Sequence, residues 1–572
     1  MPCPSRNRHL IVAIATIVIV SPTVAGCHAW RSSVVLCSLP ESCEHQQPAD
    51  FSPQGFVEKS RSEQSRAELL EDAGSEYSVD WYFAATRSAW LASQHCAGSE
   101  VLSGQAQDMY HSGLTALLRT GQRFGRLDCR AGLSVQQGTR RMTIPIVQHG
   151  FVWLPQDFSR LTPPPPHLPS LLGHRYCKEG CGVPIVVTRR RDPNSPTEVR
   201  FFPAQTPFAA TAVLRFSCAE RETGALDAPA VLEFYNPLQA AGIVSDDEIV
   251  PLAADLTAPL AVALEDSPRA YFAGFIQPGD QRDEARLTFL EPYQPGKAPV
   301  VLIHGPFSDP QSWADMINDL RASPGFTQRF QIWTFRYPTG QGFLQSAAKL
   351  RGELQAAFQD CDPINSDPAL CHTVLIGHSM GGLIAKLQVT DSEDKIWREF
   401  SNRPFSEIKA DESTRMRLAE ACFFRPLPQI TRVIFIATPH CGSTSASGAI
   451  GRLASRLVEI DAEDATQHQQ LIAQNPGVFA DFVQTRLPTS VDLLESSSPV
   501  LQAMRELRFG GGVKLHNIVG VHSPIGPSDG VVSVHSALHP NCLSEKSVAS
   551  PHGRVHRAPQ ASSEVLRILA EH

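Results

Sequence analysis

The sequence has no excess of positive charge, and this argues against one whole class of partners. Its 572 residues include 50 Lys and Arg against 58 Asp and Glu, which gives a formal net charge of -8. A protein that neutralises nucleic-acid phosphates needs a basic surface, so nucleic-acid binding is set aside. Charged residues make up only 19% of the chain and hydrophobic residues 42%, with 45 prolines. This composition indicates a globular protein with proline-rich connections rather than a disordered or coiled-coil chain.

The sequence also lacks internal repeats and complete metal-ligand patterns. The nearest approach to a metal motif is Cys177-x-x-x-Cys181, and no second cysteine or histidine pair at ligand spacing accompanies it. We therefore expect no metal and no cofactor, and we interpret these two cysteines as a loop disulfide or free thiols. Cys361 and Cys371 are close enough in sequence to bridge another loop, although spacing alone does not fix the connectivity among 14 cysteines.

The amino terminus carries a targeting pattern. Arg6 and Arg8 precede an apolar run over residues 10–20, and the small residues Val24-Ala25-Gly26-Cys27 follow it. This order is typical of a secretory signal, and the run is short for a membrane span, so residues 1–26 are predicted to be a signal peptide and the protein to be exported. The last four residues also resemble the bacterial lipobox. The resemblance implies acylation of Cys27 and a membrane lipoprotein, periplasmic or at the cell surface. An ordinary cleaved signal with a chance cysteine is the alternative.

The rest of the chain divides where its pattern changes. Residues 27–75 are polar without periodicity, which predicts a tether. Apolar residues at helical spacing predict two packed helices within a helical segment, 76–135. Short apolar runs punctuated by Pro and Gly predict a small β-rich domain over 136–294. In residues 295–572, apolar strands alternate with helices, which predicts an α/β fold with a mostly parallel, doubly wound sheet.

Individual elements of this last region can be placed from the pattern. Strands are expected at 298–303, 330–335, 373–376, 432–437, 515–521 and 546–549. Helices are expected at 311–320, 344–358, 381–389 and 561–570.

The strongest chemical signal is the run Gly377-His378-Ser379-Met380-Gly381, placed after an apolar strand and before a helix. A sharp turn from strand to helix crowds the residues around it, and only small neighbours let the serine project into a cleft. Ser379 is therefore the predicted nucleophile.

A serine nucleophile needs a histidine base and an orienting acid, and around such a turn these follow in the order Ser, acid, His. Asp529 lies in a glycine-flanked loop after the strand predicted at 515–521, which makes it the predicted acid, with Asp492 as the fallback. His552 follows the last predicted strand and is the predicted base, with His556 in the same loop as the alternative. His535 and His539 follow the acid too closely and are expected at the surface.

An oxyanion hole needs backbone N–H donors. Met380 is expected to supply one, and the loop His304-Gly305-Pro306-Phe307 should supply the other. Because Pro306 has no N–H, we expect either that Phe307 donates or that the hole is weakened.

Together these residues resemble the α/β-hydrolase superfamily, and more narrowly bacterial lipase-like proteins related in motif to GPI inositol-deacylases and triacylglycerol lipases. The resemblance covers about residues 298–572 and includes the Thr438-Pro439-His440-Cys441-Gly442-Ser443 run, after which about 444–512 would form a cap. It implies an esterase or lipase acting on ester or lipid substrates through an acyl-enzyme. An acyltransferase or lipid-linked deacylase on the same fold, or a non-catalytic surface-binding protein with a decayed hydrolase domain, are the alternatives.

Overall fold

The computed structural model describes most of the chain after its first fifty residues. The described residues are 52–95, 99–138, 140–216, 230–240, 242–245, 248–266, 285–306, 308–339, 342–443, 462–485, 488–522 and 526–572. The predicted signal peptide, Cys27 and Phe307 lie outside them. Among the described helices, none combines the length and the apolar character needed to cross a membrane.

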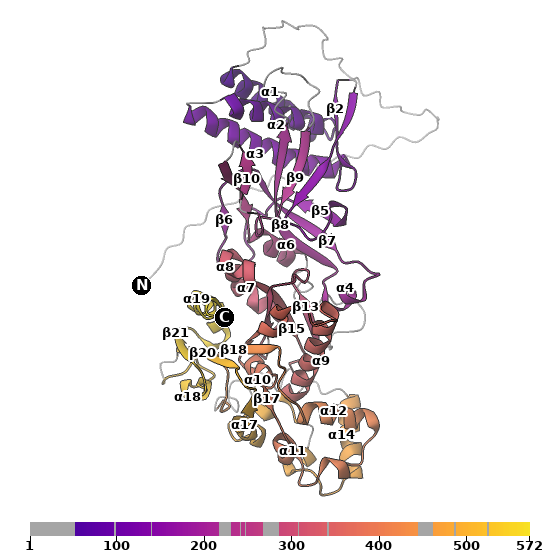
Figure 1. The fold of residues 1–572 in the computed structure, drawn as a ribbon, viewed down its shortest axis with the longest axis vertical. Helices are drawn as coiled ribbons and strands as arrows, with labels where there is room; N and C mark the ends of the chain where they lie inside the picture. The colour runs from indigo at the N-terminus through magenta and orange to yellow at the C-terminus, as the bar shows by residue number, and fades with distance from the viewer. Residues whose placement is uncertain are drawn as a thin grey trace, which may run out of the picture. The chain divides into compact units, whose positions relative to one another are not determined.

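The amino-terminal part of the described chain begins with three helices, α1 (Pro53–Asp72), α2 (Ser78–His95) and α3 (Glu100–Arg123) (Figure 1). The prediction of a tether over 27–75 is therefore wrong from Pro53 onward. The hydroxyl of Ser52 caps the first helix by accepting from Gly55 N at 3.0 Å. Few residues of α1 are buried, among them Phe56, Val57 and Ala67, so its apolar stripe is too sparse to stand out by periodicity.

A five-stranded sheet with the order β4-β9-β8-β7-β5 follows the helices. Its strands are β4 (Ile146–His149), β5 (Phe158–Thr162), β7 (Val183–Arg190), β8 (Gln205–Phe216) and β9 (Ala230–Tyr235). Buried residues of α2 and α3, such as Tyr82 and Leu114, share one core with sheet residues such as Ile185 and Leu232. The predicted helical segment and β-rich domain are thus parts of one α+β unit.

Smaller elements complete this unit and shift its predicted boundaries. A three-stranded sheet is formed by β1 (Leu127–Asp128), β2 (Gly132–Gln137) and β3 (Arg140–Ile144), so strands begin before residue 136. The remaining short elements are β6 (Cys177–Lys178), α4 (Pro196–Phe201), β10 (Gly242–Ser245), β11 (Glu248–Pro251), β12 (Ala254–Asp255) and α6 (Ala258–Asp266).

The carboxy-terminal region contains a seven-stranded sheet with the order β13-β15-β14-β16-β18-β20-β21. Its strands are β13 (Arg286–Phe289), β14 (Ala298–Ile303), β15 (Phe330–Arg336), β16 (Thr373–His378), β18 (Ile430–Ile436), β20 (Lys514–Gly520) and β21 (Ser544–Val548). All neighbouring strands are parallel except β13, which pairs antiparallel with β15. The predicted doubly wound α/β sheet is confirmed, but it starts at Arg286 rather than at 295.

Both faces of this sheet are covered by helices. Helices α9 (Phe343–Cys361) and α10 (Met380–Lys386) lie on one face, and α7 (Ala314–Ala322) and α19 (Pro559–Ala570) on the other; α8 (Pro324–Arg329) adjoins α7. Within β14, Val301 and Ile303 join the first core while Val300 and Leu302 join the second. Successive residues of a strand face opposite sides, so a strand covered on both faces is apolar throughout.

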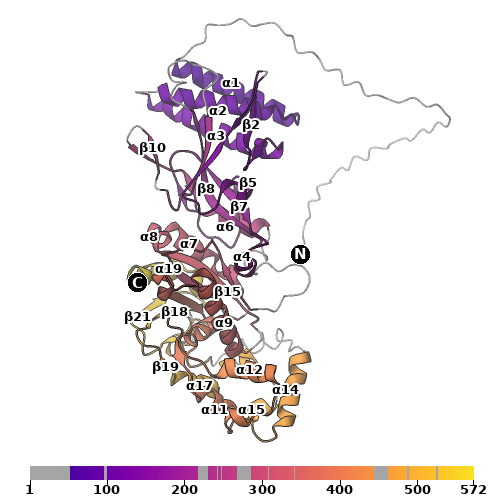
Figure 2. The same cartoon turned by 45° about the vertical axis from the view of Figure 1, so that its right-hand side comes forward.

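Two helical insertions follow the central strands. The first contains β17 (Thr390–Asp391), α11 (Lys395–Phe400) and α12 (Glu412–Cys422); the second contains α14 (Ala462–Gln474), α15 (Asp481–Thr485), α16 (Ser490–Leu494), α17 (Pro499–Arg505) and β19 (Arg508–Phe509). Figures 1 and 2 show α12 and α14 side by side, and Asn475 exchanges hydrogen bonds with the backbone of Lys409 between the insertions. Only the second insertion was expected as a cap over 444–512.

The described cysteines are all thiols in the structure. Neither Cys177 and Cys181 nor Cys361 and Cys371 form the local bridges that their spacing allowed.

Candidate functional site

The turn between β16 and α10 holds Ser379 in a strained backbone conformation. Its φ is 54°, in the left-handed region that residues with a Cβ rarely adopt. The turn closes because its neighbours are glycines. A Cβ on Gly377 would collide with the backbone of Gly381, and a Cβ on Gly381 would collide with the carbonyl of Ile303 in β14. The glycine spacing seen in the sequence is thus a packing requirement of this turn.

Ser379, His552 and Asp529 form a continuous chain of hydrogen bonds. The Oγ atom of Ser379 lies 2.9 Å from Nε2 of His552. On the other side of the ring, Nδ1 of His552 lies 2.7 Å from Oδ2 of Asp529. The three side chains come from loops that follow β16, β20 and β21, whose parallel carboxyl ends meet at one edge of the sheet. The structure therefore brings together the three residues that the sequence proposed separately.

The carboxylate of Asp529 is held from several directions. Its second oxygen, Oδ1, accepts from Val531 N at 2.9 Å and from Val532 N at 2.7 Å. Gly520, the last residue of β20, lets the acid approach, because a Cβ there would lie 2.7 Å from the Cβ of Asp529. The side chain is almost fully buried, which keeps water from competing for its hydrogen bonds. No local sequence signal points to Gly520, because its role depends on a contact that only the fold creates.

The imidazole of His552 is placed by its backbone as well as by its side chain. His552 begins the 3-10 turn His552–Arg557, and its N–H donates to the carbonyl of Asp529 at 3.0 Å. Its own carbonyl lies 3.0 Å from Nε2 of His378. Because a carbonyl oxygen can only accept, Nε2 of His378 must carry a proton. Burial lowers the pKa of His378 well below its ordinary value, with nearby His556 and His552 adding to the shift, which favours the neutral ring.

His556, the alternative base, faces a different environment. Its ring is fully buried, packs edge-on against Trp313 at 5.0 Å and lies 4.1 Å from the ring of His378. Burial lowers its pKa to about 3, so it stays neutral at physiological pH. It is His552, not His556, that the structure places against the serine.

The oxyanion donors are expected from two segments that meet at the serine. Met380 is the first residue of α10, and the first N–H groups of a helix have no intrahelical partner. The loop after β14 lies directly alongside, since a Cβ on Gly305 would lie 3.0 Å from the Cβ of Ser379. His304 anchors this loop by stacking on Tyr337, whose hydroxyl donates to the His304 carbonyl at 2.7 Å. The histidine of this His-Gly pair is thus a structural residue, a role that the sequence did not indicate.

The remaining candidates lie away from this arrangement. Asp492 caps α16 by accepting from the backbone N of Thr489 at 2.9 Å. His535 is exposed as expected, but the expectation for His539 is wrong. That side chain is buried against His440 and Phe509, because the turn that follows α18 (Val534–Ala537) folds back toward the sheet.

A strained serine in a strand-to-helix turn, a histidine and an aspartate in that chain order, and a mostly parallel sheet define the α/β-hydrolase fold class. Solved structures similar to this chain include a lipase from Bacillus licheniformis, at 14% identity over 50% of this chain and 97% of that chain, with a TM-score of 0.30. The Staphylococcus hyicus lipase is 13% identical over 48% of this chain and 95% of that chain, with a TM-score of 0.29. A metagenomic carboxyl esterase is 14% identical over 55% of this chain and 90% of that chain, with a TM-score of 0.27. No family model and no curated relative matches the sequence.

Proposed function

We propose that the protein is a serine hydrolase that cleaves carboxylic esters through an acyl-enzyme on Ser379. The observation that carries this proposal is the unbroken chain from Ser379 Oγ to His552 Nε2 at 2.9 Å and from His552 Nδ1 to Asp529 Oδ2 at 2.7 Å. A serine hydroxyl is a poor nucleophile by itself, and this chain supplies both a proton acceptor and the group that orients it.

The reaction would proceed in two halves. As Ser379 Oγ attacks the ester carbonyl carbon, its proton passes to His552 Nε2, and the carbonyl oxygen gains the negative charge. The backbone N–H of Met380, the first residue of α10, would stabilise that charge. His552 then gives the proton to the departing alcohol, leaving the acyl-enzyme. Water, deprotonated by the same imidazole, attacks this ester and releases the carboxylic acid.

Asp529 contributes by fixing the imidazole. It accepts from Nδ1–H, so the lone pair of His552 stays on Nε2, and it stabilises the imidazolium that forms when the proton arrives. Its two backbone donors fix the orientation of the carboxylate, because both N–H groups bind Oδ1 and leave Oδ2 directed at the imidazole.

The test is covalent labelling of the purified protein by a fluorophosphonate probe, together with hydrolysis of p-nitrophenyl butyrate. We expect the wild-type protein to react in both assays and Ser379→Ala to react in neither. A matched control is Ser346→Ala, which removes a buried hydroxyl on α9 that has no hydrogen-bond partner among the described residues. It should leave both signals unchanged. Labelling that persists in Ser379→Ala, or a wild-type protein inert to probe and ester, would refute the proposal.

A further inference from the structure

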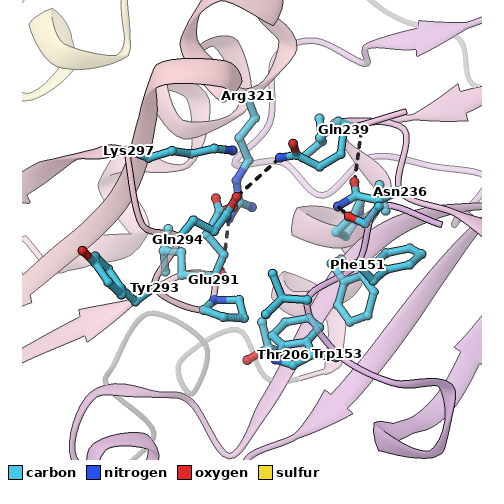
Figure 3. A pocket seen from close by; sticks show the side chains of 18 of the residues that line it. Phe151, Trp153, Thr206, Asn236, Gln239, Glu291, Tyr293, Gln294, Lys297 and Arg321 are labelled. Atoms are coloured by element: carbon cyan, nitrogen blue, oxygen red, sulfur yellow. Dashed lines mark hydrogen bonds and ion pairs between the residues drawn. The ribbon is translucent and has the colours of Figure 1, made fainter. Parts of the chain in front are cut away.

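A cavity lies where the amino-terminal α+β unit meets the seven-stranded sheet. It has a volume of about 450 Å³, within the range of small-molecule sites. Its walls come from the loop after β4, the start of β8, the turn after β9, the connection between β13 and β14, and the end of α7. Figure 3 shows the labelled lining residues.

The cavity is remote from Ser379. Lys297, one of its lining residues, directly precedes β14, whereas Gly305 beside the serine follows that strand. Six residues of β14 separate the two ends, and at ~3.3 Å per residue this is about 20 Å. The cavity therefore lies at the amino ends of the parallel strands, opposite the Ser379 site.

One end of the cavity is apolar and aromatic. Phe151 and Trp153 lie at this end in Figure 3, and both pack on Phe208, with ring centroids 5.3 Å and 4.7 Å apart. Pro207 and Leu256 extend the apolar lining. Binding an apolar ligand against this surface lowers the free energy, because apolar area on both partners is removed from water.

The other end carries more positive than negative charge. The charged residues among the described lining are Lys297, Arg321 and Glu291, so cations outnumber carboxylates by two to one. The Glu291 carboxylate is already engaged, accepting from Gln294 Nε2 at 2.9 Å and lying 3.5 Å from the Arg321 guanidinium. Figure 3 places Lys297 and Arg321 together, away from the aromatic side chains.

Lys297 has donors left for a ligand. Its ammonium makes one hydrogen bond within the described residues, to the Thr327 carbonyl at 2.6 Å, and an ammonium has three N–H donors. Burial lowers the pKa of Lys297 and Glu291 partly offsets this, so the half-buried charge of Lys297 is not fully compensated. An anion at this position would supply the missing compensation.

We propose that this cavity binds a carboxylate-bearing ligand with an apolar body, of the size of a medium-chain fatty acid. The carboxylate would accept from Lys297 Nζ, and the chain would lie against Phe151, Trp153 and Phe208. This site does not depend on the proposed function of Ser379.

The test is titration calorimetry of the full-length protein with sodium octanoate. 1-Octanol provides the same body without the charge, and sodium acetate the charge without the body. We expect octanoate to bind and the other two to bind at least tenfold more weakly. Lys297→Gln should weaken octanoate binding about tenfold, equivalent to ~1.4 kcal/mol. Lys349→Gln, on an exposed residue of α9, is the matched control and should bind like the wild type.

Binding could instead occur near Ser379, so His552→Ala is measured as well. Octanoate affinity lost in His552→Ala but kept in Lys297→Gln would overturn the proposal. Equal affinity for 1-octanol and octanoate would overturn it too. Trp153→Ala, which removes part of the apolar wall, is a second variant and should also lower the affinity for octanoate. Thermal unfolding of each variant identifies any that fail to fold.

Discussion

Replacing Asp529 by asparagine should disable the base while leaving the shape of the site intact. Two backbone amides, Val531 N and Val532 N, donate to Oδ1 at 2.9 and 2.7 Å. The asparagine carbonyl must take that position, because an amide nitrogen there would face two N–H donors and accept from neither. Its NH₂ group then points at His552 Nδ1, where Oδ2 now accepts at 2.7 Å.

The consequence is a change of tautomer. Facing a donor, Nδ1 of His552 must become the acceptor, so the ring proton moves to Nε2, which lies 2.9 Å from Ser379 Oγ. Nε2 then donates to the serine and can no longer take its proton. In a serine protease the equivalent change lowers kcat about 10⁴-fold, or ~5 kcal/mol of transition-state stabilisation. We expect a fall of about 10³ to 10⁴ here.

The assay is steady-state hydrolysis of p-nitrophenyl butyrate by purified Asp529→Asn. KM should change little, because the carboxylate is behind the imidazole and does not reach the substrate. Asp492→Asn is the control. Asp492 caps α16 rather than serving the site, so this variant should keep kcat within about threefold and lose at most ~1 kcal/mol of stability. A folded Asp529→Asn protein with more than a tenth of the wild-type kcat would refute the tautomer reasoning.

Two further predictions follow from buried histidines and from the amino terminus. Burial lowers the pKa of His304 to about 4, so it is neutral when folded but charges near pH 6.5 when unfolded, and its stability contribution is lost as pH falls. From this residue alone we expect about 2 kcal/mol less stability at pH 5 than at pH 7, measured by urea unfolding; a flat profile would contradict it. If Cys27 carries a lipid, Cys27→Ser should move the protein from the membrane to the soluble fraction, whereas Cys37→Ser should not. A wild-type protein already in the soluble fraction would rule out the anchor.

The strands of the large sheet could be predicted because a strand buried on both faces is a continuous run of apolar residues in the sequence. The strand predicted at 298–303 is β14, residue for residue, since alternate side chains enter two different cores and all must be apolar. Strand β13 could not be predicted from the sequence because it is short and lies at the edge of the sheet. The strand that it pairs with, β15, is more than forty residues further along the chain. The first insertion, with α11 and α12, was missed for a related reason. Helix α12 buries little beyond Ala421 and Cys422, so its apolar periodicity is weak.

In the site, too, features fixed by neighbouring residues in the sequence could be predicted, and features fixed by contacts with distant residues could not. The turn around Ser379 could be recognised because the constraint is local, where glycines make room for one another and for the adjacent strand. The sequence favoured His552 over His556 as the base but could not exclude His556, because the two lie four residues apart in one turn. What separates them is the burial of His556 against Trp313, a residue more than two hundred positions away.

Helix α7 connects the two ends of the sheet at which sites are proposed. Near its carboxyl end Arg321 lines the cavity, and near its amino end Asp315 pairs at 2.9 Å with Arg557, in the turn that begins with His552. Asn318, buried between them, is bound on two sides: it donates to the His174 carbonyl at 2.8 Å and accepts from Thr257 Oγ1 at 2.9 Å. Coupling between two sites needs an element with two alternative arrangements that both sites bias. Because these contacts hold α7 near both ends and at its centre, we expect occupancy of the cavity to leave the geometry of Ser379 and His552 unchanged.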